Sequence, residues 1–181
     1  MGIDPARSRV NPIGSVMTLA TTQLDHSVLR SAFAQFPSGV VALCAEIDGK
    51  PMGMAASSFV AVSMDPPLVA FCVQHTSTTW PKLTTSARIG ISVLGELHDG
   101  AARTLAAKTG NRFEGLDTTT TEDGAVFIEG ASMWLDATVT EQVPAGDHAI
   151  VLMAINELEV KADVPPIVFH GSKFRRLAVD L

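Results

Sequence analysis

Residues 53–80 read GMAASSFVAVSMDPPLVAFCVQHTSTTW, and this stretch decides the fold. Two apolar runs, each typical of a β-strand, lie on either side of the rigid corner Asp65-Pro66-Pro67. Small hydroxyl residues are frequent, and they are Ser57, Ser58, Ser63, Thr76, Ser77, Thr78 and Thr79. Hydroxyls and backbone N–H groups can bind a phosphate without a cation. The stretch therefore predicts a pocket for a flat apolar ring with a phosphate, and neither a metal site nor a nucleic-acid surface.

Strand patterns recur at short intervals along the rest of the chain. Residues 40–47 (VVALCAEI) precede Asp48-Gly49, which is the strongest hairpin signal in the sequence, so the chain should return as a strand near Met52. Further strands are predicted over residues 59–63, 68–73, 88–94, 133–140, 148–160 and 167–170. Many short strands favour a closed or nearly closed antiparallel barrel.

Few helices are predicted. Apolar spacing indicates a helix over residues 25–36 with Asp25 as its N-cap, a short helix over 75–86 capped near Thr76-Ser77, and an Ala-rich helix over 97–108. A doubly wound sheet would need a helix after most strands, and no G-x-G-x-x-G follows a strand. The fold class is therefore mainly β, with a few helices.

Composition bounds the class of protein. At 181 residues the chain suits one domain with a sizeable core. The formal net charge is -6 and the basic residues are scattered, which argues against a nucleic-acid partner. No apolar run approaches the ~20 residues that cross a bilayer, so no membrane association is expected. The two cysteines, Cys44 and Cys72, match no metal or redox spacing and are expected to be buried thiols in a reducing cytoplasm.

The N-terminal residues have a different character. They are rich in Gly, Pro and Arg without periodicity, and they lack the apolar core of a signal peptide. We expect residues 1–22 to be a disordered tail or an artificial leader, and residues 23–181 to form the folded domain.

Motifs along the chain together resemble the flavin reductase-like family, the FMN-binding split barrels. Residues 53–59 (GMAASSF) and 63–69 (SMDPPLV) resemble the family signature, and Ser77-x-Thr79 resembles its phosphate contact. Residues 91–94 (ISVL), 111–115 (NRFEG), 146–148 (GDH) and 166–169 (PIVF) resemble its downstream motifs. The resemblance implies an antiparallel Greek-key split β-barrel of the FMN-binding type over about residues 29–177.

The resemblance also nominates the residues of a flavin site. They are Gly53, Met54, Ala55, Ser57, Ser58, Cys72, Gln74, Ser77, Thr78, Thr79 and Ser92. Two of them depart from the family pattern. Ala55 replaces the common threonine, which removes a hydroxyl, and Ser92 replaces an asparagine, which shortens a donor.

A second group is implied for the nicotinamide dinucleotide. Gly146-Asp147-His148 is expected to seat it over the flavin, with His148 as the catalytic residue and Asp147 either orienting the ring or capping the turn. The chain has no tyrosine, so Phe174 and His170 are the local stand-ins for an aromatic cover. Arg103 and Arg112 are candidates for the outer part of a dinucleotide. No nucleophile–base set and no zinc spacing is present in the sequence.

The activity implied by the resemblance is that of an NAD(P)H:flavin oxidoreductase. It would reduce FMN or FAD by hydride transfer from nicotinamide C4 to flavin N5, using NADH or NADPH. It would act as a homodimer and supply reduced flavin to a flavin-dependent monooxygenase. The alternative is a non-catalytic flavin-binding carrier or sensor on the same barrel. A barrel of the pyridoxamine-phosphate-oxidase type is less favoured, because residues 53–80 carry no basic side chain.

Overall fold

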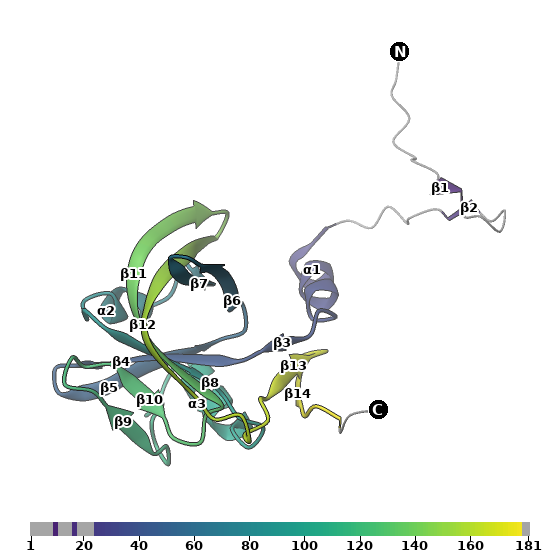
Figure 1. Ribbon diagram of the computed structural model, residues 1–181. Coiled ribbons are helices and arrows are strands. Elements are labelled where there is room, and N and C mark those ends of the chain that lie inside the picture. Colours follow the sequence, from purple (N-terminus) through teal and green to yellow (C-terminus); the bar gives the residue numbers. More distant parts are fainter. Residues whose placement is uncertain (1–8, 11–15, 18–23, 179–181) are drawn as a thin grey trace. The chain divides into compact units, whose positions relative to one another are not determined.

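The computed structural model describes residues 9–10, 16–17 and 24–178 (Figure 1). The chain divides into two compact units, residues 1–33 and 34–181. The predicted domain boundary after residue 22 falls outside the described residues and stays a prediction.

The described residues of the first unit form one short helix and one strand pair. Strands β1 (Arg9–Val10) and β2 (Val16–Met17) are antiparallel, and helix α1 spans His26–Phe33. The Asp25 side chain caps α1 as predicted, because its Oδ1 accepts hydrogen bonds from the N–H groups of Ser27 and Val28 at 2.8 and 2.9 Å. These bonds, led by that from Val28, lower the pKa of the Asp25 carboxyl.

The second unit is built on one antiparallel sheet of seven strands. In spatial order they are β5 (Lys50–Ala56), β4 (Val41–Ile47), β8 (Ile89–Val93), β11 (Met133–Ala145), β12 (His148–Val160), β7 (Pro67–Gln74) and β6 (Val60–Met64). The sheet curves into a barrel (Figure 1). Its edge strands β5 and β6 do not pair with each other, so the barrel is split. The mainly β class is confirmed.

Smaller elements surround this sheet. They are β9 (Thr118–Thr120) with β10 (Val126–Ile128), the sheet of β3 (Ser38–Gly39), β13 (Val168–His170) and β14 (Lys173–Arg175), and helices α2 (Trp80–Leu83) and α3 (Asp99–Ala106). The helix predicted over residues 97–108 is confirmed as α3.

The sequence of strand β4 is apolar without alternation because both faces of the strand are buried. Val41, Leu43 and Ala45 point into the barrel core, whereas Ala42 and Cys44 face a second core. That second core includes Leu105 of α3 and Val126 of β10, so α3 and β10 cover the outer face of the strand. A strand buried on both faces reads as a continuous apolar run.

Two local predictions have contrasting outcomes. The Asp48-Gly49 hairpin is confirmed, because Ile47 pairs with Lys50 and both turn residues have positive φ, 53° and 70°. The helix predicted over residues 75–86 is wrong in length, since only Trp80–Leu83 is helical. The Ser77 hydroxyl accepts the Trp80 N–H at 3.1 Å, so a side-chain hydrogen bond precedes the helix, and Pro81 lies in its first turn, where proline is tolerated.

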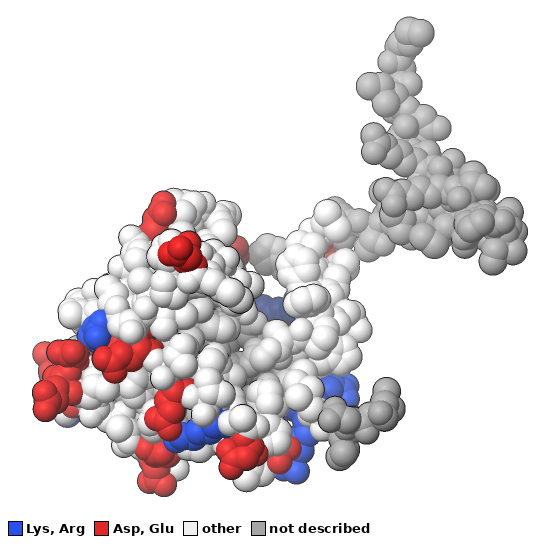
Figure 2. Space-filling model, viewed as in Figure 1, with Lys and Arg blue, Asp and Glu red and all other residues white. Residues whose placement is uncertain are grey.

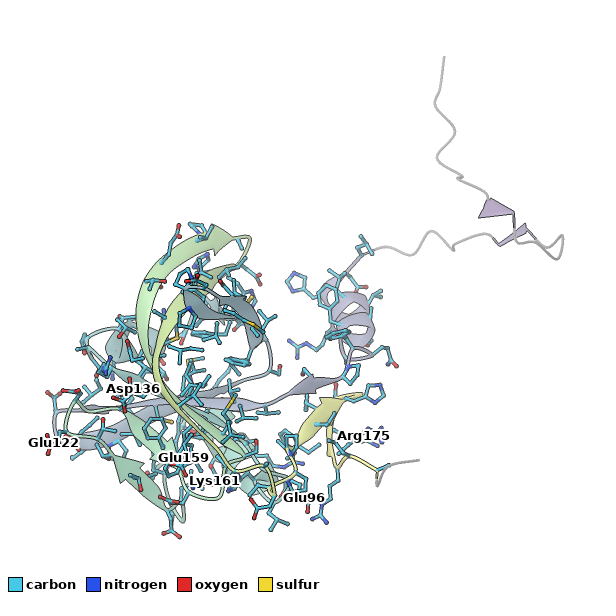
Figure 3. The ribbon with its side chains drawn as sticks, viewed as in Figure 1. Glu96, Glu122, Asp136, Glu159, Lys161 and Arg175 are labelled. Carbon is cyan, nitrogen blue, oxygen red and sulfur yellow. The ribbon has the colours of Figure 1, made fainter. Side chains whose placement is uncertain are left out.

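Charged groups of both signs lie close together on the surface of the second unit. Lys161 Nζ lies 3.9 Å from a carboxylate oxygen of Glu159 and 3.8 Å from the centre of the Trp134 ring (Figure 3). Acidic and basic side chains are interspersed over the lower part of the face in Figure 2. Among the residues that the structure describes, no helix is long and apolar enough to span a membrane.

Candidate functional site

A cavity of about 660 Å³ lies in the second unit, where β5 and β7 end. This volume falls within the range of about 300–1,000 Å³ that is usual for small-molecule sites. Its wall comes from the end of β5 and the following loop, the end of β7, the loop before α2, the end of α3, Arg112 and His148. Segments distant in sequence therefore meet around one hollow.

Most of the nominated residues lie on this cavity. They are Met54, Ala55, Ser57, Ser58, Cys72, Gln74, Ser77, Thr78, Thr79 and His148. The two halves of the 53–80 stretch are joined by Ser58, whose hydroxyl accepts the Cys72 N–H at 2.9 Å and donates to the Cys72 carbonyl at 3.1 Å. Ser58 thereby fixes the loop after β5 against β7.

Arg112 adds a positive charge that residues 53–80 lack. Its Nη1 donates to the Thr79 hydroxyl at 2.6 Å and to the Gly53 carbonyl at 3.0 Å. Thr79 is buried and directly precedes α2. Its hydrogen bond therefore holds the guanidinium against the end of the loop that leads into α2. Lys108 also lines the cavity. An anion in the cavity would meet hydroxyl groups and two cations.

These cations remove one argument made from the sequence. The missing basic residues counted against a barrel of the pyridoxamine-phosphate-oxidase type, but distant segments supply Arg112 and Lys108. Helix α2 is a single turn of four residues, so the dipole at its N-terminus contributes little to this wall. Side-chain hydroxyls and cations, rather than a helix end, make the polar wall.

His148 begins β12 and also lines the cavity. It pairs in register with Gln74 of β7. Its Nδ1 lies 2.7 Å from Oδ1 of Asp147, and the His75 N–H donates to the Asp147 carbonyl at 3.0 Å. The turn is thus tied to the end of β7, and the Asp147 carboxylate is positioned to orient the imidazole.

The structure does not bring every nominated residue to the cavity. The Ser92 side chain is fully buried and its hydroxyl accepts the Ile128 N–H at 2.9 Å. Because β10 covers β8 there, Ser92 joins two strands and does not line the cavity. Phe174 lies on β14, where it packs against Phe169 at 5.4 Å and under Arg103 at 4.9 Å. Neither residue lines the cavity.

The surroundings of Gly53 and of the two cysteines test further predictions made from the sequence. Gly53 lies in close contact, since a Cβ there would be 2.4 Å from Cys44 Sγ and 3.0 Å from Phe113. Cys44 is buried as expected, and burial raises the pKa of its thiol. The prediction that Cys72 is buried is wrong, because alternation along β7 turns it away from the core and onto the cavity.

Several lining residues were not nominated from the sequence. They are Ala56, Val73, Thr76, Leu105, Ala106 and Lys108. Arg112 was assigned only to the outer part of a dinucleotide. The signal available for it was the motif at residues 111–115, but only the fold shows which carbonyl and hydroxyl its guanidinium meets.

A second hollow of about 290 Å³ shares Thr78, Thr79 and Arg112 with the cavity. Its remaining wall includes Gly53 and the exposed Lys82. Within the described ranges, no group of three or more His, Cys, Asp or Glu side chains is placed to hold a metal ion. The donor set of both hollows suits phosphate and a flat ring: hydroxyls, cations and small apolar side chains.

Comparison with known proteins agrees with this donor set. A family model described as "Flavin reductase like domain" matches residues 33–178. A flavin reductase of Pseudomonas putida is 35% identical over 153 residues, which cover 84% of this chain and 90% of that protein. The flavin-dependent monooxygenase, reductase subunit HsaB, of Mycobacterium tuberculosis is 34% identical over 156 residues, covering 85% of this chain and 83% of that protein.

A solved structure has the same fold. The NADH:FAD oxidoreductase SgcE6 of Streptomyces globisporus C-1027, determined in complex with NAD and FAD fragments, superposes with a TM-score of 0.81. The two chains are 33% identical, and the match covers 86% of this chain and 94% of that one.

Proposed function

Because the chain belongs to the flavin reductase-like domain family, we propose that it is an NAD(P)H:flavin oxidoreductase. It reduces FMN or FAD with NADH or NADPH and supplies reduced flavin to a separate flavin-dependent monooxygenase. The observation that carries the proposal is one cavity that combines a hydroxyl wall, the guanidinium of Arg112 and the imidazole of His148.

The basic end of the cavity binds the flavin phosphate. The hydroxyls of Ser77 and Thr78 and the cations of Arg112 and Lys108 line it. Charge-assisted hydrogen bonds to phosphate are stronger than neutral ones. Arg112 is already held by Thr79 and Gly53, so it loses little freedom on binding. These residues anchor the cofactor and fix its orientation.

The rest of the cavity holds the ring. Small residues at Ala55 and Ala56 allow backbone groups to approach a planar ligand closely, and Met54 and Val73 add apolar surface. A bound flavin supplies the two-electron acceptor chemistry that no side chain of the cavity has. The protein contributes alignment and the exclusion of water, so it needs no acid or base for hydride transfer.

We assign His148 to the nicotinamide donor. It lies on the cavity away from the second hollow, and its contact with Asp147 at 2.7 Å fixes the ring orientation. Because Nδ1 donates to the Asp147 carboxylate, Nε2 of a neutral imidazole is an acceptor, so it can accept a hydrogen bond from the carboxamide N–H of a nicotinamide. Its role is to position the donor over the flavin ring.

A homodimer is supported by the edge strand β6. Val60, Val62 and Met64 are 54%, 49% and 98% exposed. An edge strand with large exposed apolar side chains is an interaction surface. A second copy of the chain would cover it. The free thiols of Cys44 and Cys72 are consistent with the proposed cytoplasmic location.

The monooxygenase partner is supported by the names of two relatives. The HsaB protein of Mycobacterium tuberculosis is a reductase subunit of a flavin-dependent monooxygenase, and BorF is the flavin reductase component of a bacterial two-component tryptophan halogenase. BorF has a TM-score of 0.79 and is 27% identical to this chain. Both names describe one component of a larger flavin-dependent system.

The direct test is NADH or NADPH oxidation, followed by absorbance, with FMN, FAD or riboflavin as acceptor. We expect rapid oxidation with at least one pair and none without flavin. If no pair reacts while the chain still binds flavin, the reductase function is wrong and the carrier or sensor function takes its place. If no flavin binds, both functions fail.

A further inference from the structure

The loop of residues 57–59 connects β5 and β6, the two edge strands between which the barrel is split. We infer that Ser58 is a positioning residue for the reaction. Its hydroxyl does not contact the flavin but holds this loop at the distance from β7 that aligns the ring. This inference rests on the proposed function, and it replaces the direct flavin contact that the family resemblance implied for Ser58.

Ser58 stands where the ladder between β6 and β7 would have its next pair. Val60 pairs with Ala70, so Ser58 faces Cys72 when the register is continued along both strands. In an antiparallel ladder, every second facing pair exchanges main-chain N–H···O=C bonds in both directions. Here β6 begins only at Val60, and the Ser58 hydroxyl accepts the Cys72 N–H at 2.9 Å and donates to the Cys72 carbonyl at 3.1 Å. A side chain therefore takes the place of one main-chain pair of the sheet.

These two bonds leave the Ser58 hydroxyl without a donor for a ligand. A serine hydroxyl carries one O–H, and the Cys72 carbonyl uses it. Turning the hydroxyl toward a flavin would exchange two hydrogen bonds for one and would leave both main-chain groups of Cys72 without this partner. Ser58 lines the cavity, so its effect on a bound flavin passes through the loop that it holds.

The same arrangement leaves main-chain donors of the loop unused. Among the described residues, the N–H groups of Ser57 and Ser58 donate to no other part of the chain. Both residues line the cavity, so these N–H groups are available to an acceptor on a bound ring. Phe59 packs against the barrel core and anchors the end of the loop, while the Ser58 hydroxyl fixes its middle against β7. Hydride transfer depends on ring alignment, so a loosened loop should slow it.

Two substitutions at Ser58 and one control test this role. Ser58→Ala removes both hydrogen bonds, and Ser58→Thr keeps the hydroxyl. The control is Ser63→Ala, because the Ser63 hydroxyl also accepts a main-chain N–H, that of Asp65 at 3.2 Å, but lies outside both hollows. We would measure the dissociation constants of FMN and of lumiflavin, which is the ring without ribityl phosphate, and kcat with saturating FMN and nicotinamide donor.

Ser58→Ala should weaken FMN and lumiflavin by the same factor, about fivefold, and should lower kcat about tenfold. Ser58→Thr should restore the affinities and kcat, and Ser63→Ala should change none of them. A larger loss of FMN than of lumiflavin would place the Ser58 hydroxyl at the phosphate and overturn the inference. Lower stability of Ser58→Ala with unchanged affinities and kcat would also overturn it, because Ser58 would then be merely structural.

Hydrogen exchange of the Cys72 amide separates a positioning residue from a direct ligand. In the unaltered chain this exchange should be slow without flavin and stay slow with FMN bound, and Ser58→Ala should accelerate it in both states. Faster exchange on FMN binding would show that the hydroxyl leaves Cys72 for the flavin, which would overturn the inference. Affinity and exchange are measured without turnover. If they behave as expected while NADH and NADPH reduce no flavin, the inference stands and only the reductase function fails.

Discussion

The guanidinium of Arg112 donates to the Thr79 hydroxyl at 2.6 Å, which joins residues 33 positions apart in the sequence. The same nitrogen donates to the Gly53 carbonyl at 3.0 Å. Thr79 closes the hydroxyl-rich stretch, and Gly53 opens it. One arginine from a later segment therefore clamps both ends of the stretch around the cavity and brings the charge that the stretch lacks.

Replacing this arginine should separate phosphate binding from ring binding. Arg112→Met is expected to weaken FMN by tenfold or more, because a charge-assisted contact contributes about 1.5–3 kcal/mol, and to change riboflavin affinity little. The double variant Ser77→Ala/Thr79→Ala should likewise lose much more affinity for FMN than for riboflavin. Fluorescence titration with both ligands checks this.

The control for this experiment is Arg103→Met. Arg103 lies over the Phe174 ring and outside the cavity lining, so flavin affinity should be unchanged. Similar losses of FMN and riboflavin in Arg112→Met would contradict the phosphate assignment and make Arg112 a structural clamp. A double-mutant cycle of Arg112→Met and Thr79→Ala, measured on the free energy of FMN binding, should give a coupling energy between the two residues of about 1 kcal/mol.

A second prediction concerns His148. His148→Ala should raise the KM for NADH or NADPH several-fold and leave the dissociation constant of the flavin nearly unchanged, because the imidazole lines the cavity but not the second hollow, whose wall Thr79 and Arg112 share. Steady-state kinetics and flavin titration of the same preparation check both values. His75→Ala serves as the matched variant, since His75 is exposed and does not line the cavity. Parallel loss of donor and flavin binding would instead make His148 a structural residue.

The sequence predicted what depends on neighbours in the chain. The Asp48-Gly49 hairpin needs only two residues that tolerate positive φ, and the Asp25 cap needs only a carboxylate before a helix. Both are local and both are correct. The hydroxyl-rich stretch was found because most of its members are consecutive, so their common location required no knowledge of the fold.

What the sequence did not reveal depends on tertiary packing. Ser92 was expected at the ligand, but β10 covers β8 and turns its hydroxyl into an acceptor for Ile128. Cys72 was expected in the core, but the alternation of β7 places it on the cavity. Arg112 and Lys108 reach the same wall only because the segment after α3 returns to the end of β5. None of these contacts can be predicted from the spacing of residues along the sequence.

A third prediction follows from His98, at the start of α3. The Gly95 N–H donates to His98 Nδ1 at 3.0 Å, so this nitrogen is an acceptor and the ring is neutral. Burial lowers the pKa of His98, and a hydrogen bond to the Glu129 backbone opposes this only in part. Protonation would place a proton on Nδ1 facing the Gly95 N–H.

The sign of the pH effect follows from this lowered pKa. The unfolded chain binds a proton at His98 from about pH 6.5 downward, whereas the folded chain binds it only at lower pH. The contribution of neutral His98 to the free energy of unfolding is therefore fully present above about pH 6.5. It is lost as the pH falls through the pKa of His98 in the folded chain. Urea unfolding between pH 8 and 5 should show a smaller loss for His98→Gln than for the unaltered chain. His26→Gln, at an exposed position, should follow the unaltered chain, and superimposable curves for all three would refute the role of His98.

The fourth prediction uses two glycines with opposite surroundings. A Cβ on Gly90 of β8 would lie 2.2 Å from the Val126 carbonyl oxygen and 2.8 Å from its carbon. Both are backbone atoms of β10, which cannot move away without breaking the covering layer over β4. Gly90→Ala should therefore lower the free energy of unfolding by about 2–3 kcal/mol. Gly100 lies in α3, where an added Cβ would meet no neighbouring group within 4 Å, so Gly100→Ala should raise the free energy of unfolding by about 0.5–1 kcal/mol. Chemical denaturation measures both, and a Gly90→Ala protein as stable as Gly100→Ala would show that β10 does not pack on β8 as closely as these distances require.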